Sequence, residues 1–180
     1  MYTKLTYILK PSHIQEIIHH INSGEILYNN LPIKQKHNNH IVIAAVKKDI
    51  NNIKLIPARF YDDYFVMLEL VNHNGLLLDY ASEELIQDHN IVLTAVRQNG
   101  MALKIVYDYE TIYEEEYTCT DGYDIYGPCI VRESRNIIDE SYQNLVDDDE
   151  IVLTALAHDA NAFDFISSRL QQKIDFLMIE

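Results

Sequence analysis

The chain has 180 residues and a mass of 21.0 kDa, enough for one domain with a core or for a short array of repeats. Its net charge of −14 excludes a typical nucleic-acid-binding protein, because such proteins gather Lys and Arg against phosphates. No apolar run is long enough to cross a bilayer, residues 1–10 lack a secretory signal, and two cysteines do not make a disulfide scaffold. We therefore expect no membrane insertion and a reducing, cytoplasmic setting.

An internal repeat begins in the first half of the chain. Ser12-His-Ile-Gln15 has the form of a capping box that opens a first helix. The apolar segment at 41–46 then matches residues 66–71 and 91–96 in steps of 25, and recurs at 151–156, 60 residues further on. Since the last step equals one period and 35 more residues, one unit carries an insertion of 35 residues.

Each unit is predicted to contain a helix of about ten residues, a second, shorter helix such as Leu76–Tyr80, and a turn. Asp88 is a candidate N-cap, with Asp147 or Asp148 in the corresponding later place. The first helices end near Asn74-Gly75 and Asn99-Gly100, where glycine is expected in the left-handed conformation. Four apolar columns continue the period: Ile21, Val46, Val71, Val96 and Leu156; Ile18, Ile43, Leu68, Leu93, Leu153 and Met178; Tyr28, Ile53, Leu78, Leu103 and Phe163; Leu31, Ile56, Ala81, Val106 and Ile166.

These columns favour helices over strands, because the apolar residues fall at helical offsets and the units carry Asp and Gly caps. Isolated helices of this length are marginal in water, so each must bury its apolar stripe against a neighbour. The sequence therefore predicts an all-α fold, an α-solenoid of short helix pairs with a 25-residue period, in a single domain over 1–180.

Residues 80–103 also carry a resemblance. The run Y-A-S-E-E-L, followed by D-H-N-I-V-L-T-A-V-R-Q-N-G-M-A-L, resembles a family known only as a domain of unknown function. The likeness is close over about 76–106 and partial over 147–170. That family forms tandem helical repeats in amoeba-associated intracellular bacteria, giant viruses of amoebae and some protists. The resemblance implies a repeat scaffold and a host-directed effector role, in the cytoplasm or delivered into a host cell without a classical signal peptide.

The insertion at about 107–139 is the most unusual segment. It contains six tyrosines and both cysteines, and residues 107–150 together carry a charge of −12. We read it as a loop, and loops on rigid scaffolds often bind partners through tyrosine. The candidate contacts are Tyr113, Tyr117, Tyr123 and Tyr126; the alternative is that the tyrosines pack on the last helices. The acidic surroundings of Cys119 disfavour a nucleophile, and a disulfide to Cys129 is the other alternative.

A polar column lies near the ends of the first helices. It consists of Lys48, His73, Gln98 and His158. In a solenoid such residues form a ridge that can bind a partner, or they only satisfy the last helix carbonyls. His37 and His40 lack a further ligand at metal-binding spacing, so we expect no metal site and no cofactor.

These patterns predict a protein–protein interaction module with a protein partner, no nucleic acid and no catalytic residue. The alternatives are an enzyme, with a pocket between the insertion and Tyr80, His73 or His158, and a purely structural repeat segment.

Overall fold

The structure is a computed structural model that describes residues 10–116, 123–124, 127–128 and 145–177. The described part is mostly helical, which confirms the all-α prediction. Its only strands are the two-residue β1 (Tyr123–Asp124) and β2 (Gly127–Pro128), which pair antiparallel. No helix in these ranges is long and apolar enough to cross a membrane. The α-helices are α1 (Pro11–Ser23), α2 (Ile33–Lys36), α3 (Asn39–Lys48), α4 (Tyr64–His73), α5 (Glu83–Ile86), α6 (His89–Gln98), α7 (Leu103–Glu116), α8 (Asp149–His158) and α9 (Ser168–Leu177).

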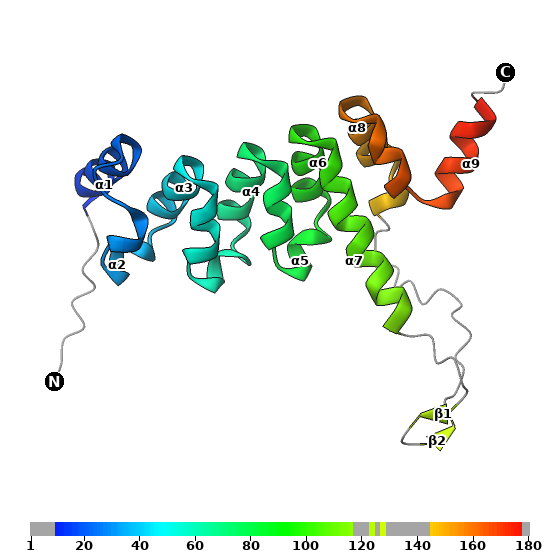
Figure 1. Ribbon diagram of the computed structural model, residues 1–180, viewed down its shortest axis with the longest axis horizontal. Coiled ribbons are helices and arrows are strands. Elements are labelled where there is room, and N and C mark those ends of the chain that lie inside the picture. The colour runs from blue at the N-terminus through cyan, green and yellow to red at the C-terminus, as the bar shows by residue number, and fades with distance from the viewer. Residues whose placement is uncertain (1–9, 117–122, 125–126, 129–144, 178–180) are drawn as a thin grey trace.

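Five of these helices stand side by side. α1, α3, α4, α6 and α8 each contact the next one in a row along the long axis of the molecule (Figure 1). The short helices α2 and α5 lie below that row in the same view, and α7 runs down and away from it. In the part of the chain that the structure describes, seven 3₁₀ helices connect these elements: η1 (Tyr28–Asn30), η2 (Ile50–Leu55), η3 (Ala58–Phe60), η4 (Gly75–Tyr80), η5 (Gly100–Ala102), η6 (Leu145–Asp147) and η7 (Ala160–Phe165).

The helices of the row after α1 begin in the same way. The carboxamide or carboxylate of the N-cap residue accepts a hydrogen bond from the backbone N–H three residues on, which satisfies a donor that the helix leaves free. This confirms Asp88 as an N-cap and selects Asp148 over Asp147. The four bonds are Asn38 to Ile41 (3.2 Å), Asp63 to Val66 (3.1 Å), Asp88 to Ile91 (2.9 Å) and Asp148 to Ile151 (2.9 Å).

The first helix departs from the prediction. α1 begins at Pro11, and its N-cap residue Lys10 makes no side-chain cap hydrogen bond. The capping box predicted at Ser12 is therefore wrong, because Ser12 already lies inside the first turn. Proline suits the first helical position, since its fixed φ is helical and its missing N–H would have had no partner there.

The same four helices also end alike. Asp49, Asn74, Asn99 and Asp159 have extended backbones, and the side chain of each accepts a hydrogen bond of 2.9–3.0 Å from the N–H two residues further on. That bond opens the 3₁₀ helix that follows, so the predicted second helix over 76–80 is 3₁₀ rather than α.

The two Asn-Gly glycines have a different reason from the one predicted. Among the described residues only Gly24 has a positive φ, of 83°. A Cβ on Gly75 would lie 2.3 Å from the carbonyl oxygen of Ala95, and one on Gly100 would lie 2.4 Å from that of Ala155. Both glycines are therefore required because the backbone approaches the next helix of the row closely.

Three of the four apolar columns form the core. Their members are buried or half-buried, and no polar or charged residue is buried in the described part. The second column is the exception: Ile18, Ile43 and Leu68 are only half-buried, and Leu153 is 63% exposed. Leu93, in contrast, is buried, so this column is covered at α6 and only partly covered at the other helices of the row.

The insertion begins as a helix rather than as the predicted loop, because α7 continues to Glu116. The Tyr107 ring meets Phe165 edge-on at 5.8 Å, and the Tyr109 hydroxyl accepts a hydrogen bond of 3.0 Å from Gln87 Nε2. These two tyrosines pack on the scaffold, as the alternative interpretation of the insertion expected.

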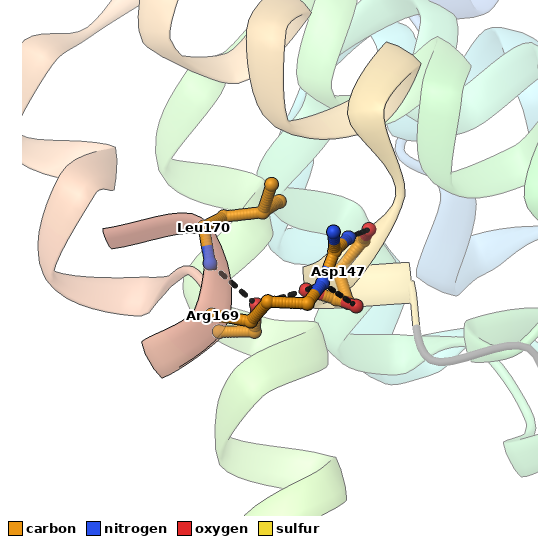
Figure 2. Close-up of polar contacts among 4 residues, drawn as sticks. Asp147, Arg169 and Leu170 are labelled. Atoms are coloured by element: carbon orange, nitrogen blue, oxygen red, sulfur yellow. Dashed lines mark hydrogen bonds and ion pairs between the residues drawn. The ribbon is translucent and has the colours of Figure 1, made fainter. Parts of the chain in front are cut away.

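Beyond the insertion, Asp147 anchors α9 (Figure 2). Arg169 Nε donates to both carboxylate oxygens of Asp147, at 3.0 and 2.7 Å, and Arg169 Nη2 donates to its carbonyl at 3.2 Å. The Ser167 hydroxyl donates to the same carboxylate and accepts from the Leu170 N–H at 3.3 Å. The hydrogen bond and the negative charge of Asp147 raise the pKa of Arg169. Asp147 of η6 thus holds the start of α9 in place through Ser167 and Arg169.

Burial of Tyr28 makes the stability of the fold depend on pH in the alkaline range. Burial, and then the neighbouring Tyr61, raise the pKa of Tyr28 from 10.0 to about 12. The folded state therefore holds this proton more tightly than the unfolded state does, and its stabilisation is complete below pH 10 and is lost as the pH rises towards 12. We expect denaturant unfolding to show a steeper loss of stability over this range in the parent chain than in Tyr28→Phe. Equal losses in both would contradict the assignment.

Candidate functional site

A groove runs across α1, α3 and α4 and encloses about 1010 Å³. Its floor is the first half of the second apolar column, Ile18, Ile43 and Leu68, one residue from each helix. These side chains are half-buried, because they pack against the edge of the core on one side and border the groove on the other. The remaining lining residues are Asn22, His37, Asn38, Asn39, His40, Ala44, Lys47, Lys48, Phe65, Val66 and Glu69.

Phe65 is the most exposed large apolar side chain of the groove. It is 76% accessible to solvent in the first turn of α4, where its ring meets Tyr64 edge-on at 5.7 Å. His40 and Asn90, which lie 25 residues before and after it, are polar. An exposed phenylalanine gains no burial energy in the isolated chain, and aromatic residues of this kind are typical of contact surfaces.

The rim of the groove is polar and tied together by hydrogen bonds. Lys47 Nζ on α3 pairs with Glu69 Oε2 on α4 at 2.8 Å. Lys48 Nζ donates to the carbonyl of Asn22 in α1 at 2.7 Å. Each ammonium group has three donors, so each keeps donors for a bound acceptor. Surface pairs of this type are weak, and a ligand can displace them.

One further bond crosses the rim. Asn39 Nδ2 donates to the carboxylate of Asp63 at 3.1 Å, and the same carboxylate caps α4 through the Val66 N–H. The negative charge of Asp63 is therefore already engaged by two donors. The groove can thus hold a ligand with apolar groups on its floor and hydrogen-bond acceptors at its rim.

Of the four residues of the predicted polar ridge, only Lys48 lines the groove. Lys48, His73, Gln98 and His158 are all exposed in the last turns of α3, α4, α6 and α8. Lys48 lines the groove, and Gln98 Oε1 accepts a hydrogen bond of 2.5 Å from the Gly75 N–H. Two members of the ridge thus tie neighbouring helices together, whereas His73 and His158 have no hydrogen-bond or ion-pair partner in the described part of the chain.

The side chains of Tyr113, Tyr117, Tyr123 and Tyr126 lie outside the described residues, as do Cys119 and Cys129. His37 and His40 both line the groove, but the residues that the structure describes contain no group of three or more potential metal ligands.

A second, smaller groove of about 550 Å³ lies where α7 leaves the row. Its apolar lining includes Leu76, Ile86, Met101 and Ile105, with Tyr109 at one side. Lys104 and Asp108 pair across one turn of α7 and also line it. Neither groove is lined by Tyr80, His73 or His158, the residues suggested for an enzyme pocket.

Sequence reasoning did not find the main groove, although its signals were present. The second column was treated as core, whereas Ile18, Ile43 and Leu68 are half-buried, Leu93 is buried and Leu153 is exposed. The break of pattern at Phe65, an aromatic residue between two polar ones 25 residues away, was the second available signal.

Comparison with known proteins supports part of the resemblance. Residues 63–109 match the family profile described as a domain of unknown function (DUF4116). The matched stretch runs from the N-cap of α4 into α7, and it contains the segment 80–103 on which the resemblance rested. It includes Phe65, Leu68 and Glu69 of the groove but not α1 or α3. No curated protein and no solved structure matches the chain.

Proposed function

We propose that the chain is a short α-solenoid of 25-residue units and that it serves as a protein-binding module. The solenoid reading is supported by the row of helices, by their common N-caps at residues 38, 63, 88 and 148, and by the common Asx turns at their ends. Stacked units of this kind bury a continuous core and leave one long face for a partner.

The observation that carries the binding role is the groove with its exposed Phe65. It combines an apolar floor with a polar rim, which is the composition of a protein contact site. A groove between parallel helices accepts an extended or helical segment of another chain. Leu153 of the same column is exposed on α8, but Leu93 on α6 between them is buried, so the groove is confined to α1, α3 and α4.

The test is affinity capture from cell lysate, followed by calorimetry of the purified captured protein against the full chain. Phe65→Glu places a charge on the groove and is expected to weaken binding at least tenfold, because aromatic anchors of this type contribute about 2 kcal/mol or more. Ile33→Glu is the matched control, since Ile33 is 75% exposed and lies outside the groove lining. It is expected to leave binding unchanged.

A third variant separates the groove from the insertion. Deletion of residues 109–135 removes most of the acidic, tyrosine-rich segment. If the groove is the site, this chain retains the partner. Loss of binding on deletion, with Phe65→Glu unaffected, would transfer the site to the insertion. A protein that binds all three variants equally would contradict both surfaces.

A further inference from the structure

The groove lies partly in a basic stretch of the chain and partly on α4, where residues 61–73 contain three Asp and Glu and no Lys or Arg. Residues 10–60 contain seven Lys and Arg against three Asp and Glu, a charge of +4 in a chain whose total is −14. Five of the eight histidines also fall in this stretch. α1 and α3, which form two of the three helices of the groove, belong to it.

The side chains that line the groove also carry more positive than negative charge. The described lining holds two ammonium groups, Lys47 and Lys48, and one carboxylate, Glu69, which pairs with Lys47. The carboxylate of Asp63 lies beside the lining and accepts hydrogen bonds from Asn39 and from the Val66 N–H. At physiological salt, charges are screened over about 8 Å, so a bound segment senses these nearby residues much more than the acidic part of the chain further along the row. The local field therefore favours an anionic ligand despite the acidic total.

From this charge and the apolar floor we propose, resting on the protein-binding role above, that the groove binds a short acidic segment of a partner protein. Leu or Phe side chains of that segment pack on Ile18, Ile43, Leu68 and Phe65. Its carboxylates take up the free donors of Lys48 and displace Glu69 from Lys47. Charge complementarity of this kind supplies specificity and a fast association rate.

The test uses the full chain and a fluorescein-labelled synthetic peptide of about twelve residues that alternates Asp and Glu with Leu and Phe, followed by fluorescence anisotropy. A second peptide with Asn and Gln in place of the acids is the ligand control. The acidic peptide is expected to bind at least about tenfold more tightly, with an affinity that falls as salt rises.

Three variants of the chain locate the effect. Lys48→Glu is expected to lower the affinity about tenfold or more, whereas Lys54→Glu, an exposed basic residue of the same stretch outside the groove lining, changes it less than about threefold. Glu69→Gln frees Lys47 and is expected to raise the affinity a few-fold. If Glu69 had only a structural role, Glu69→Gln would not raise the affinity for the acidic peptide.

Several outcomes would overturn the proposal. Equal binding of the acidic and neutral peptides removes the role of charge, and equal losses for Lys48→Glu and Lys54→Glu indicate nonspecific attraction. Self-association of the chain that Phe65→Glu abolishes, measured by sedimentation velocity, would make a second copy the occupant. If the peptides do not bind but the captured protein still depends on Phe65, the acidic ligand is wrong while the protein-binding function stands.

Discussion

Gly100→Ala is expected to lower the free energy of unfolding by about 2–3 kcal/mol, because the added methyl group overpacks the contact between η5 and α8. Its Cβ would lie 2.4 Å from the Ala155 carbonyl oxygen and 3.1 Å from the Asp159 nitrogen. Both are backbone atoms of α8 and its cap, so neither can move without shifting the helix. Alanine reduces the entropy of the unfolded chain, but by less than about 1 kcal/mol. Urea unfolding followed by circular dichroism measures the difference.

Ala160 provides the matched control for this change. It occupies the corresponding place after α8, where the chain already has a Cβ and the residue is exposed. Ala160→Gly is expected to cost at most about 1 kcal/mol, which is the entropic difference between the two residues. If Gly100→Ala were neutral, the two helices would not be in close backbone contact.

Phe60→Ala is expected to be the most destabilising single substitution discussed here, with a loss of about 3–5 kcal/mol. Phe60 is fully buried in η3, ahead of α4, and its ring also lies 4.4 Å from the Arg59 guanidinium carbon. Removal of the ring leaves a cavity that a close-packed core fills only in part. Domains of this size are stable by about 5–15 kcal/mol, so the variant is expected to unfold at a markedly lower temperature.

Phe65→Ala is the control, since the same substitution is made five residues away on a side chain that is 76% exposed. Its free energy of unfolding is expected to change by less than about 0.5 kcal/mol. The comparison also tests the proposed function, because Phe65 contributes little to the fold and is available for a partner. A large destabilisation by Phe65→Ala would mean that its ring packs on the scaffold.

Much of the helical framework follows from the sequence alone. The 25-residue spacing of the apolar residues predicted the all-α fold and the position of the helices at 39–48, 64–73, 89–98 and 149–158 to within a few residues. Asp88 was identified as a cap from its type and place, and the later cap was narrowed to Asp147 or Asp148, of which the structure selects Asp148. These features depend on short-range physics, namely helical periodicity and hydrogen bonds within one turn, which a linear sequence contains.

The tertiary structure decided what those elements do. The glycines after Asn74 and Asn99 suggested left-handed caps. They are needed because the next helix approaches, a contact between residues 20 positions apart for Gly75 and 55 positions apart for Gly100. The second column looked like core, but the packing of the row buries Leu93 and leaves Ile18, Ile43 and Leu68 half-buried and Leu153 exposed. Periodicity shows which residues share a helix face; only the packing of neighbouring helices decides whether that face is covered, and with it where a partner can bind.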